Sequence, residues 1–120
     1  MSHRPEVLLL DILEAGAAIN MFVEGRTLAD YGQDLMLRSA VERQFTIIGE
    51  ALRRLERLDP DLVSHISEHR RIIDFRNIIA HGYEIVDDET VWQAIQDKLP
   101  TLLNETESLL AKLGEDKPEV

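Results

Sequence analysis

Apolar residues recur along the chain at alternating spacings of three and four, the period of one face of an α-helix. Four apolar stretches stand out, and the first two follow this alternation throughout. Their apolar positions are Leu8, Ile12, Ala15, Ile19 and Phe22; Val41, Phe45, Ile48, Leu52 and Leu55; Ile72, Phe75 and Ile79; and Val91, Trp92, Ile95, Leu99, Leu102, Leu103, Leu109, Leu110 and Leu113. The sequence shows no period-two alternation, the pattern of a half-buried β-strand, and no internal repeat. We therefore expect an all-α protein.

Residues that favour helix ends delimit the first two stretches. Pro5 fits a first helical turn and Gly25 fits a C-terminal cap, which predicts a helix over about 5–24. Asp34 begins a second long helix, and Pro60 stops it at about residue 58. Short helical turns are expected over 27–31 and 62–66.

The second half of the chain holds the other two long helices. One is predicted over about 67–80, with Gly82 as its natural end, and the last is capped by Asp87 or Asp88. Pro100 lies inside the last helix and should kink it, because proline removes one intrahelical hydrogen bond. The sequence thus predicts a four- to five-helix antiparallel bundle. We expect one domain over residues 1–114 and a frayed polar tail over 115–120.

Composition narrows the class of protein. The chain has 120 residues, 44% of them hydrophobic, which suits a single domain with a buried core. It has no cysteine, which excludes disulfides and thiolate metal sites and fits a reducing cytoplasm. No leader-like segment and no apolar run of 18 residues occurs, so we expect neither secretion nor membrane insertion.

The net charge of −10 is unevenly distributed. Residues 38–76 hold eight basic residues, all arginines, and seven acidic ones, whereas the rest of the chain holds five basic and sixteen acidic residues. The planar guanidinium group of arginine suits phosphate binding. The electrostatic field inside a cleft, rather than the net charge of the chain, decides which ligands the cleft attracts. Two interpretations stay open: some of these arginines handle RNA, or they are solvated charges on helix faces.

The segment 75–83, which reads Phe-Arg-Asn-Ile-Ile-Ala-His-Gly-Tyr, gathers the candidate chemistry. Arg76 can bind a phosphate with two hydrogen bonds and stabilise charge that builds on phosphorus. His81 titrates near neutral pH and can take or give a proton. With Asn77 orienting the phosphate, these residues suffice for metal-free RNA cleavage by attack of a 2′-hydroxyl on its neighbouring phosphate.

Helical geometry complicates this assignment. Arg76 and His81 are five residues apart, about 140° around an ideal helix. They converge on one phosphate only if the helix loosens near Gly82 or a second subunit completes the site. The alternative is that His81 merely caps the last helical turn, where an imidazolium is favoured by the helix dipole.

The spacing of Arg76, His81 and Tyr83 resembles the R-x4-H-x-Y motif of HepT-like toxins, members of the HEPN superfamily. The likeness spans about 7–113. Its other elements are the runs Arg-Ser-Ala-Val-Glu-Arg at 38–43, Ile-Ile-Gly-Glu-Ala at 47–51, Asp-Phe-Arg-Asn at 74–77, Val-Trp at 91–92 and Leu-Pro at 99–100.

This resemblance implies a homodimer of helical protomers in which the Arg and His of both subunits face one cleft. Such proteins are metal-independent endoribonucleases without a cofactor, and they act as toxins of type II (HEPN/MNT) systems. Their antitoxin is an MntA-like nucleotidyltransferase that transfers AMP to the motif's tyrosine, here Tyr83. The implied partners are therefore RNA and this antitoxin, which can join the dimer in a larger hetero-oligomer in the cytoplasm.

Other interpretations of single residues also stay open. Glu50 either orients an arginine of the active cleft or is a solvated helix charge. Tyr83 either accepts AMP or only packs against the last helix. His65 and His69 have a spacing that can bind metal, but no further ligand pattern accompanies them. The alternative function is a non-catalytic helical partner or substrate that docks on a nucleotidyltransferase and presents Tyr83 for modification, although such a module would not need both Arg76 and His81.

Overall fold

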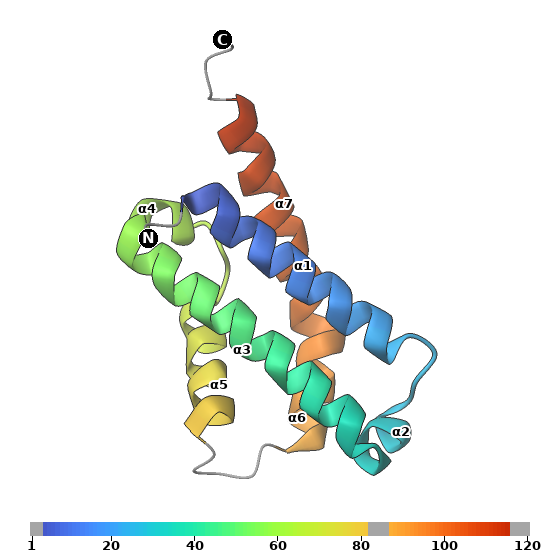
Figure 1. Cartoon of the computed structure of the whole chain (residues 1–120). Helices are drawn as coiled ribbons and strands as arrows, with labels where there is room; N and C mark the ends of the chain where they lie inside the picture. The colour runs from blue at the N-terminus through green and yellow to red at the C-terminus, as the bar shows by residue number, and fades with distance from the viewer. Residues whose placement is uncertain (1–3, 82–86, 116–120) are drawn as a thin grey trace.

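The computed structural model describes residues 4–81 and 87–115, and these residues form helices and their connections without any strand. The helices are α1 (Pro5–Val23), α2 (Leu28–Gln33), α3 (Leu35–Leu58), α4 (Pro60–Val63), α5 (His69–His81), α6 (Asp88–Gln93), the π-helical segment η1 (Ala94–Lys98) and α7 (Leu99–Glu115). Because α6, η1 and α7 follow one another without a break, the described chain has four long helical units that run in alternating directions (Figure 1). The all-α prediction and the antiparallel bundle are confirmed.

Side-chain caps fix where several helices begin. Thr27 and Asp30 form a reciprocal capping box at the start of α2, the arrangement that satisfies two otherwise unpaired backbone donors. The Asp34 carboxylate accepts from the backbone N–H of Leu37 at 3.0 Å and so caps α3. Asp59 caps α4 in the same way, and Asp87 accepts from Glu89 at the start of α6. The predicted cap residues Asp34 and Asp87 are therefore confirmed.

Three predicted elements have shifted boundaries, and the first is the short turn predicted over 27–31, which is observed as α2 (Leu28–Gln33) and continues through Gly32. Helix α5 begins at His69 rather than at residue 67, because Glu68 adopts a φ of +57°, a left-handed conformation that cannot continue an α-helix. Helix α4 covers Pro60–Val63 rather than 62–66, since Asp59 supplies a cap and Pro60 suits a first helical position. Gly25 has a φ of +72° just after α1, which is the conformation expected of a helix-terminating glycine.

The irregularity expected at Pro100 takes the form of a π-helix. The segment η1 ends two residues before Pro100, and Pro100 lies in the first turn of α7. A proline cannot donate to the carbonyl four residues earlier, and its ring crowds that carbonyl. The wider π-helical turn just before Pro100 relieves both conflicts, and such single π-helical turns occur inside longer α-helices.

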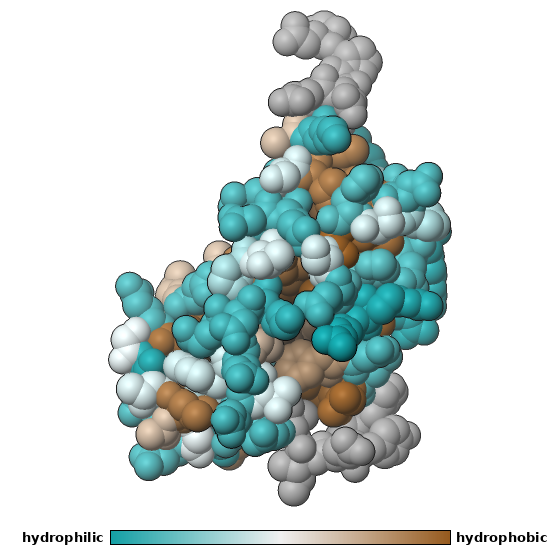
Figure 2. Space-filling view, turned by 180° about the vertical axis from the view of Figure 1, so that it is seen from behind, coloured by the Kyte–Doolittle hydropathy of each residue, from teal (hydrophilic) through white to brown (hydrophobic). Residues whose placement is uncertain are grey.

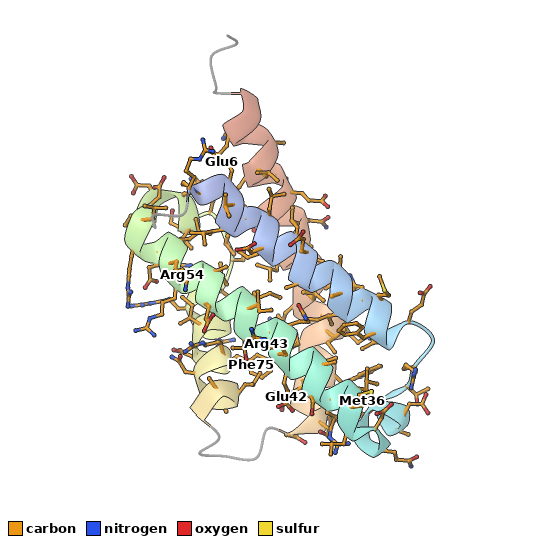
Figure 3. All side chains as sticks on the ribbon, in the orientation of Figure 1. Glu6, Met36, Glu42, Arg43, Arg54 and Phe75 are labelled. Atoms are coloured by element: carbon orange, nitrogen blue, oxygen red, sulfur yellow. The ribbon has the colours of Figure 1, made fainter. Side chains whose placement is uncertain are left out.

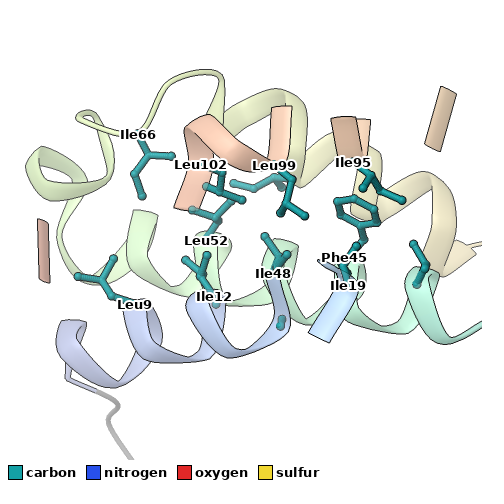
Figure 4. Packing of buried hydrophobic residues seen from close by; sticks show 14 of the residues in the cluster. Leu9, Ile12, Ile19, Phe45, Ile48, Leu52, Ile66, Ile95, Leu99 and Leu102 are labelled. Carbon is teal, nitrogen blue, oxygen red and sulfur yellow. The ribbon is translucent and has the colours of Figure 1, made fainter. Parts of the chain in front are cut away.

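The core lies where α1, α3 and the α6–η1–α7 unit meet. The predicted positions of α1 from Leu8 to Ile19 and all five predicted positions of α3 are buried, and Figure 4 shows Ile12, Ile48 and Leu99 packed together. The predicted residues of the last helix also belong to the core or pack against it. In α5, however, the most buried residue is Ile73, while Ile72, Phe75 and Ile79 pack against the core only in part.

The surface behind the view of Figure 1 is mainly hydrophilic, with separate hydrophobic areas between the polar side chains (Figure 2). Among the described residues, no helix combines the length and the apolar character that a bilayer crossing requires.

Candidate active site

Helix α5, which carries the candidate residues, packs along α3. The rings of Phe45 on α3 and Phe75 on α5 meet edge to face, with centroids 5.2 Å apart and planes at 78°. Such a contact favours one relative position of the two rings. Phe75 lies where α5 passes α3 (Figure 3), so the residue after it, Arg76, is held at the surface of α3. The expectation that Phe45 belongs to the core is confirmed, because only 5% of it is exposed.

Gly49 is the residue of α3 over which Arg76 lies. A Cβ built on Gly49 would overlap Cβ and Cγ of Arg76, so any other residue here would push the arginine stem away. The sequence shows Gly49 only as part of the stretch 47–51, and a glycine inside a long helix is otherwise unfavourable by roughly 1 kcal/mol relative to alanine. Its place is explained by this close approach of the two helices.

The Arg76 guanidinium is held by two partners. Its Nη2 donates to Oε1 of Glu50 at 3.0 Å, and its Nη1 donates to Oδ1 of Asn77 at 2.9 Å. The side chain of Arg76 is 15% exposed and that of Glu50 is 43% exposed. Of the two interpretations of Glu50, the geometry therefore favours the one in which it orients an arginine. The three residues Glu50, Arg76 and Asn77 are called the arginine cluster below.

The cluster leaves hydrogen-bond donors on Arg76. Nε is buried and has no hydrogen-bond partner among the described residues. Nη1 and Nη2 each carry two N–H groups, and one of each is used by Asn77 and Glu50. One N–H on each of these nitrogens is thus left for an incoming ligand. Donors on both terminal nitrogens of a guanidinium can bind two oxygens of one phosphate.

His81 is the last residue of α5, so the backbone places it at the end of the helix that carries the arginine cluster. Its side chain, together with Gly82 and Tyr83, lies outside the described residues. The predicted approach of His81 to Arg76 and the predicted position of the Tyr83 hydroxyl therefore stay predictions.

Tyr31, the other tyrosine of the chain, is fully buried. Its ring packs against Trp92 with centroids 5.7 Å apart. Burial, helped by the nearby carboxylates of Glu42 and Asp88, raises the pKa of the Tyr31 phenol above its usual range. Tyr31 is consequently closed to a modifying enzyme.

His65 and His69, the two histidines considered as a metal site, have different surroundings. His69 lies with Nδ1 3.3 Å from the carbonyl oxygen of Ile66 and Nε2 3.4 Å from a Glu56 carboxylate oxygen. His65 lines a separate surface hollow between α4 and α7. Within 4–81 and 87–115, no three His, Asp or Glu side chains gather in a way that could hold a metal ion.

The close contact at Gly49 makes a prediction about stability. We expect Gly49→Ala to destabilise the fold by about 1–3 kcal/mol, because the new methyl must displace the stem of Arg76 in a packed interface. Gly114→Ala is the matched control, since a Cβ there meets nothing within 4 Å. That variant should be neutral or stabilised by up to about 1 kcal/mol. The free energy of unfolding of both variants is measured by urea denaturation. A Gly49→Ala chain as stable as the native chain would contradict the role assigned to Gly49.

Comparison with known proteins adds the family context. The family model described as HepT-like, ribonuclease HepT-like, matches residues 12–109. A candidate ribonuclease HepT of Thermococcus cleftensis is 30% identical over 105 residues, which cover 84% of this chain and 91% of that protein. A candidate RNase of Methanocaldococcus jannaschii is 28% identical over 108 residues, covering 89% of this chain and 98% of that protein.

A longer relative contains the same region. A protein of M. jannaschii named as a gamma-glutamylcyclotransferase and candidate RNase is 27% identical over 112 residues, covering 93% of this chain but only 50% of that protein. The chain thus spans about half the length of this relative. No solved structure matches the chain significantly. On the family match over most of its length, the chain belongs to the HepT-like ribonuclease family.

Proposed function

We propose that this protein is a metal-independent endoribonuclease that acts as the toxin of a type II toxin–antitoxin system. The observation that carries the proposal is the arginine cluster, in which Glu50 and Asn77 hold Arg76 on the helix that ends at His81. Membership of a ribonuclease family supports RNA as the substrate. The reaction is transfer of the phosphate from the 5′-oxygen of one nucleotide to the 2′-oxygen of its neighbour.

Each step of this reaction has a group to perform it. The 2′-hydroxyl loses its proton to a base and attacks phosphorus, while the bond from phosphorus to the 5′-oxygen breaks and that oxygen gains a proton. The products are a 2′,3′-cyclic phosphate and a 5′-hydroxyl. His81 is the proposed proton-transfer group, and Arg76 stabilises the negative charge on the equatorial oxygens in the transition state.

Glu50 and Asn77 are proposed as positioning residues. A carboxylate and a carboxamide fix the guanidinium plane before substrate arrives, and a preorganised donor needs no rearrangement during reaction. The side chain of Arg76 is only 15% exposed, so water competes weakly with a phosphate that binds to it. The remaining donors of Nη1 and Nη2 are proposed to contact that phosphate.

A homodimer is part of the proposal. The reaction needs a base and an acid, and two copies of His81 in one cleft would supply both. Ile78 lies three residues before His81, on a neighbouring part of the helix surface. It is 43% exposed and offers an apolar contact to a second copy. Cross-linking that placed the two α5 helices on opposite outer surfaces of the assembly would contradict this arrangement.

The activity is tested by incubating the purified chain, without any partner protein, with RNA and an excess of EDTA. We expect cleavage that leaves a 2′,3′-cyclic phosphate or its opened product and a 5′-hydroxyl. Loss of cleavage on addition of EDTA would overturn the metal-independent mechanism.

The proposed control of the toxin acts at Tyr83. An MntA-like nucleotidyltransferase in the cytoplasm would transfer AMP from ATP to the phenol oxygen and release pyrophosphate. The fully buried Tyr31 is closed to such an enzyme, which leaves Tyr83 as the tyrosine to modify. The added nucleotide would bring bulk and a negative phosphodiester close to the residues that receive RNA, and so compete with substrate.

We expect Tyr83→Phe to keep ribonuclease activity and to resist neutralisation by the nucleotidyltransferase and ATP, because the variant keeps the ring and loses the acceptor hydroxyl. Mass spectrometry of the native chain treated with that partner should show adenylate on Tyr83. An adduct at another residue, or a Tyr83→Phe chain neutralised as readily as the native one, would refute this mechanism.

A further inference from the structure

A hollow between α3 and α5 adjoins the arginine cluster. It has a volume of about 570 Å³ and is open to solvent. Its walls, called the arginine groove below, are Arg53, Glu56 and Arg57 of α3 and Arg70, Ile73, Asp74 and Asn77 of α5. Asn77 belongs both to the groove and to the cluster, because its carboxamide accepts a hydrogen bond from Arg76. The groove therefore begins at the proposed cleavage site.

The groove has three arginines against two carboxylates, those of Glu56 and Asp74. Arg70 pairs with Glu56 at 3.0 Å, and Glu56 also contacts His69 at 3.4 Å. Arg53 and Arg57 are exposed and form no ion pair within the part of the chain that the structure describes. Two unpaired guanidiniums on one wall of a hollow are ready to bind anions, in a chain whose net charge is −10.

The length of the groove fits more than one anion. Arg70 and Asn77 are seven residues apart, about 10 Å along the axis of α5, and Arg53 and Arg57 are one turn apart on α3. A single free phosphate would use only part of this length. A polyanion with evenly spaced charges would use all of it, and single-stranded RNA is the polyanion that the proposed function brings to Arg76.

We propose that the arginine groove binds the phosphates of RNA that flank the cleaved phosphate, with Arg53 and Arg57 as the principal contacts. The inference rests on the proposed function and extends it to the path of the substrate. Phosphate contacts position a nucleic acid without reading its bases, so the groove confers affinity and register rather than sequence preference. Bound RNA would compete with Glu56 for Arg70, and Glu56 would keep its contact with His69.

The test compares two double variants of equal net charge. The groove variant is Arg53→Gln with Arg57→Gln, and the control is Arg26→Gln with Arg71→Gln. Arg26 and Arg71 lie outside the groove and pair with Asp34 and Glu68. The probe is a 2′-O-methyl RNA oligonucleotide, which cannot be cleaved by 2′-hydroxyl attack, and its Kd is measured over a range of salt concentrations.

We expect the groove variant to bind the probe about tenfold or more weakly at 0.1 M salt, with a slope of log K against log salt reduced by about 1.4. The control should keep the native slope and cleave RNA at the native rate. A groove variant with native affinity and slope would overturn the inference, and so would a control that weakens as much, since net charge alone would then explain binding.

The same experiment separates this inference from the proposed function. If the native chain cleaves RNA and the groove variant binds like the native chain, the groove proposal fails and the ribonuclease stands. If the native chain neither binds the probe nor cleaves RNA, both proposals fail together.

Discussion

Replacement of Arg76 by lysine is expected to lower the rate of RNA cleavage by about 100-fold or more without unfolding the chain. Removing one preorganised donor at a developing oxyanion typically costs 10²–10³ in rate. The guanidinium donates from two different nitrogens, to Glu50 at 3.0 Å and Asn77 at 2.9 Å, and keeps a donor on each for phosphate. An ammonium group has one nitrogen with three donors and cannot reproduce this planar fork.

The control for this substitution is Arg43→Lys. Arg43 is also an arginine of the region rich in that residue, lies exposed on α3 (Figure 3), and has no ion pair within the described residues. It should retain near-native cleavage. Helix content and the midpoint of thermal unfolding show whether each variant is folded. A folded Arg76→Lys chain with native activity would show that the bidentate geometry is not used.

His81→Ala should reduce cleavage by at least about 100-fold, which is the lower end of what a positioned proton-transfer group contributes. If His81 only caps the end of α5, the variant should instead lose stability and keep its activity per folded molecule. Cleavage rates measured against pH separate the two roles. The native profile should depend on groups that titrate near neutral pH, and the variant should lose that dependence.

His65→Ala is the matched control for His81→Ala, since His65 is exposed in a hollow lined by residues of α4 and α7. We expect native rates and a native pH profile from this variant. An active, folded His81→Ala chain would contradict the role of His81 in proton transfer, whether or not the roles of the other residues hold.

The long helices could be predicted from the sequence because their apolar spacing extends over several turns and their caps are local. Asp34 caps α3 through the backbone N–H of Leu37, three residues ahead of it, and such capping contacts depend on neighbouring residues alone. The start of α5 was less predictable, since the left-handed backbone of Glu68 accompanies contacts to Arg71 and, across the fold, to Lys98.

The arginine cluster could be predicted only in part. The motif singles out Arg76 and His81, and the periodicity of α3 places Glu50 off the core stripe without saying what it faces. The contact of Glu50 with Arg76 depends on how α3 and α5 pack, as does the role of Gly49, which sequence reasoning missed. An unfavourable glycine inside an otherwise strong helix was the available signal. The roles of Asn77, His81 and Tyr83, the homodimer and the single-domain boundary at residue 114 stay predictions.

The central claim is that the 2′-hydroxyl of RNA attacks the phosphate bound by Arg76. It is tested most directly with one RNA and a copy that carries a single 2′-deoxy nucleotide immediately 5′ of the cleaved phosphate, both incubated with the purified chain and EDTA. We expect cleavage of the unmodified RNA at that phosphate and none of the deoxy copy there, with cleavage elsewhere unchanged. Equal cleavage of both RNAs at that phosphate would contradict the mechanism.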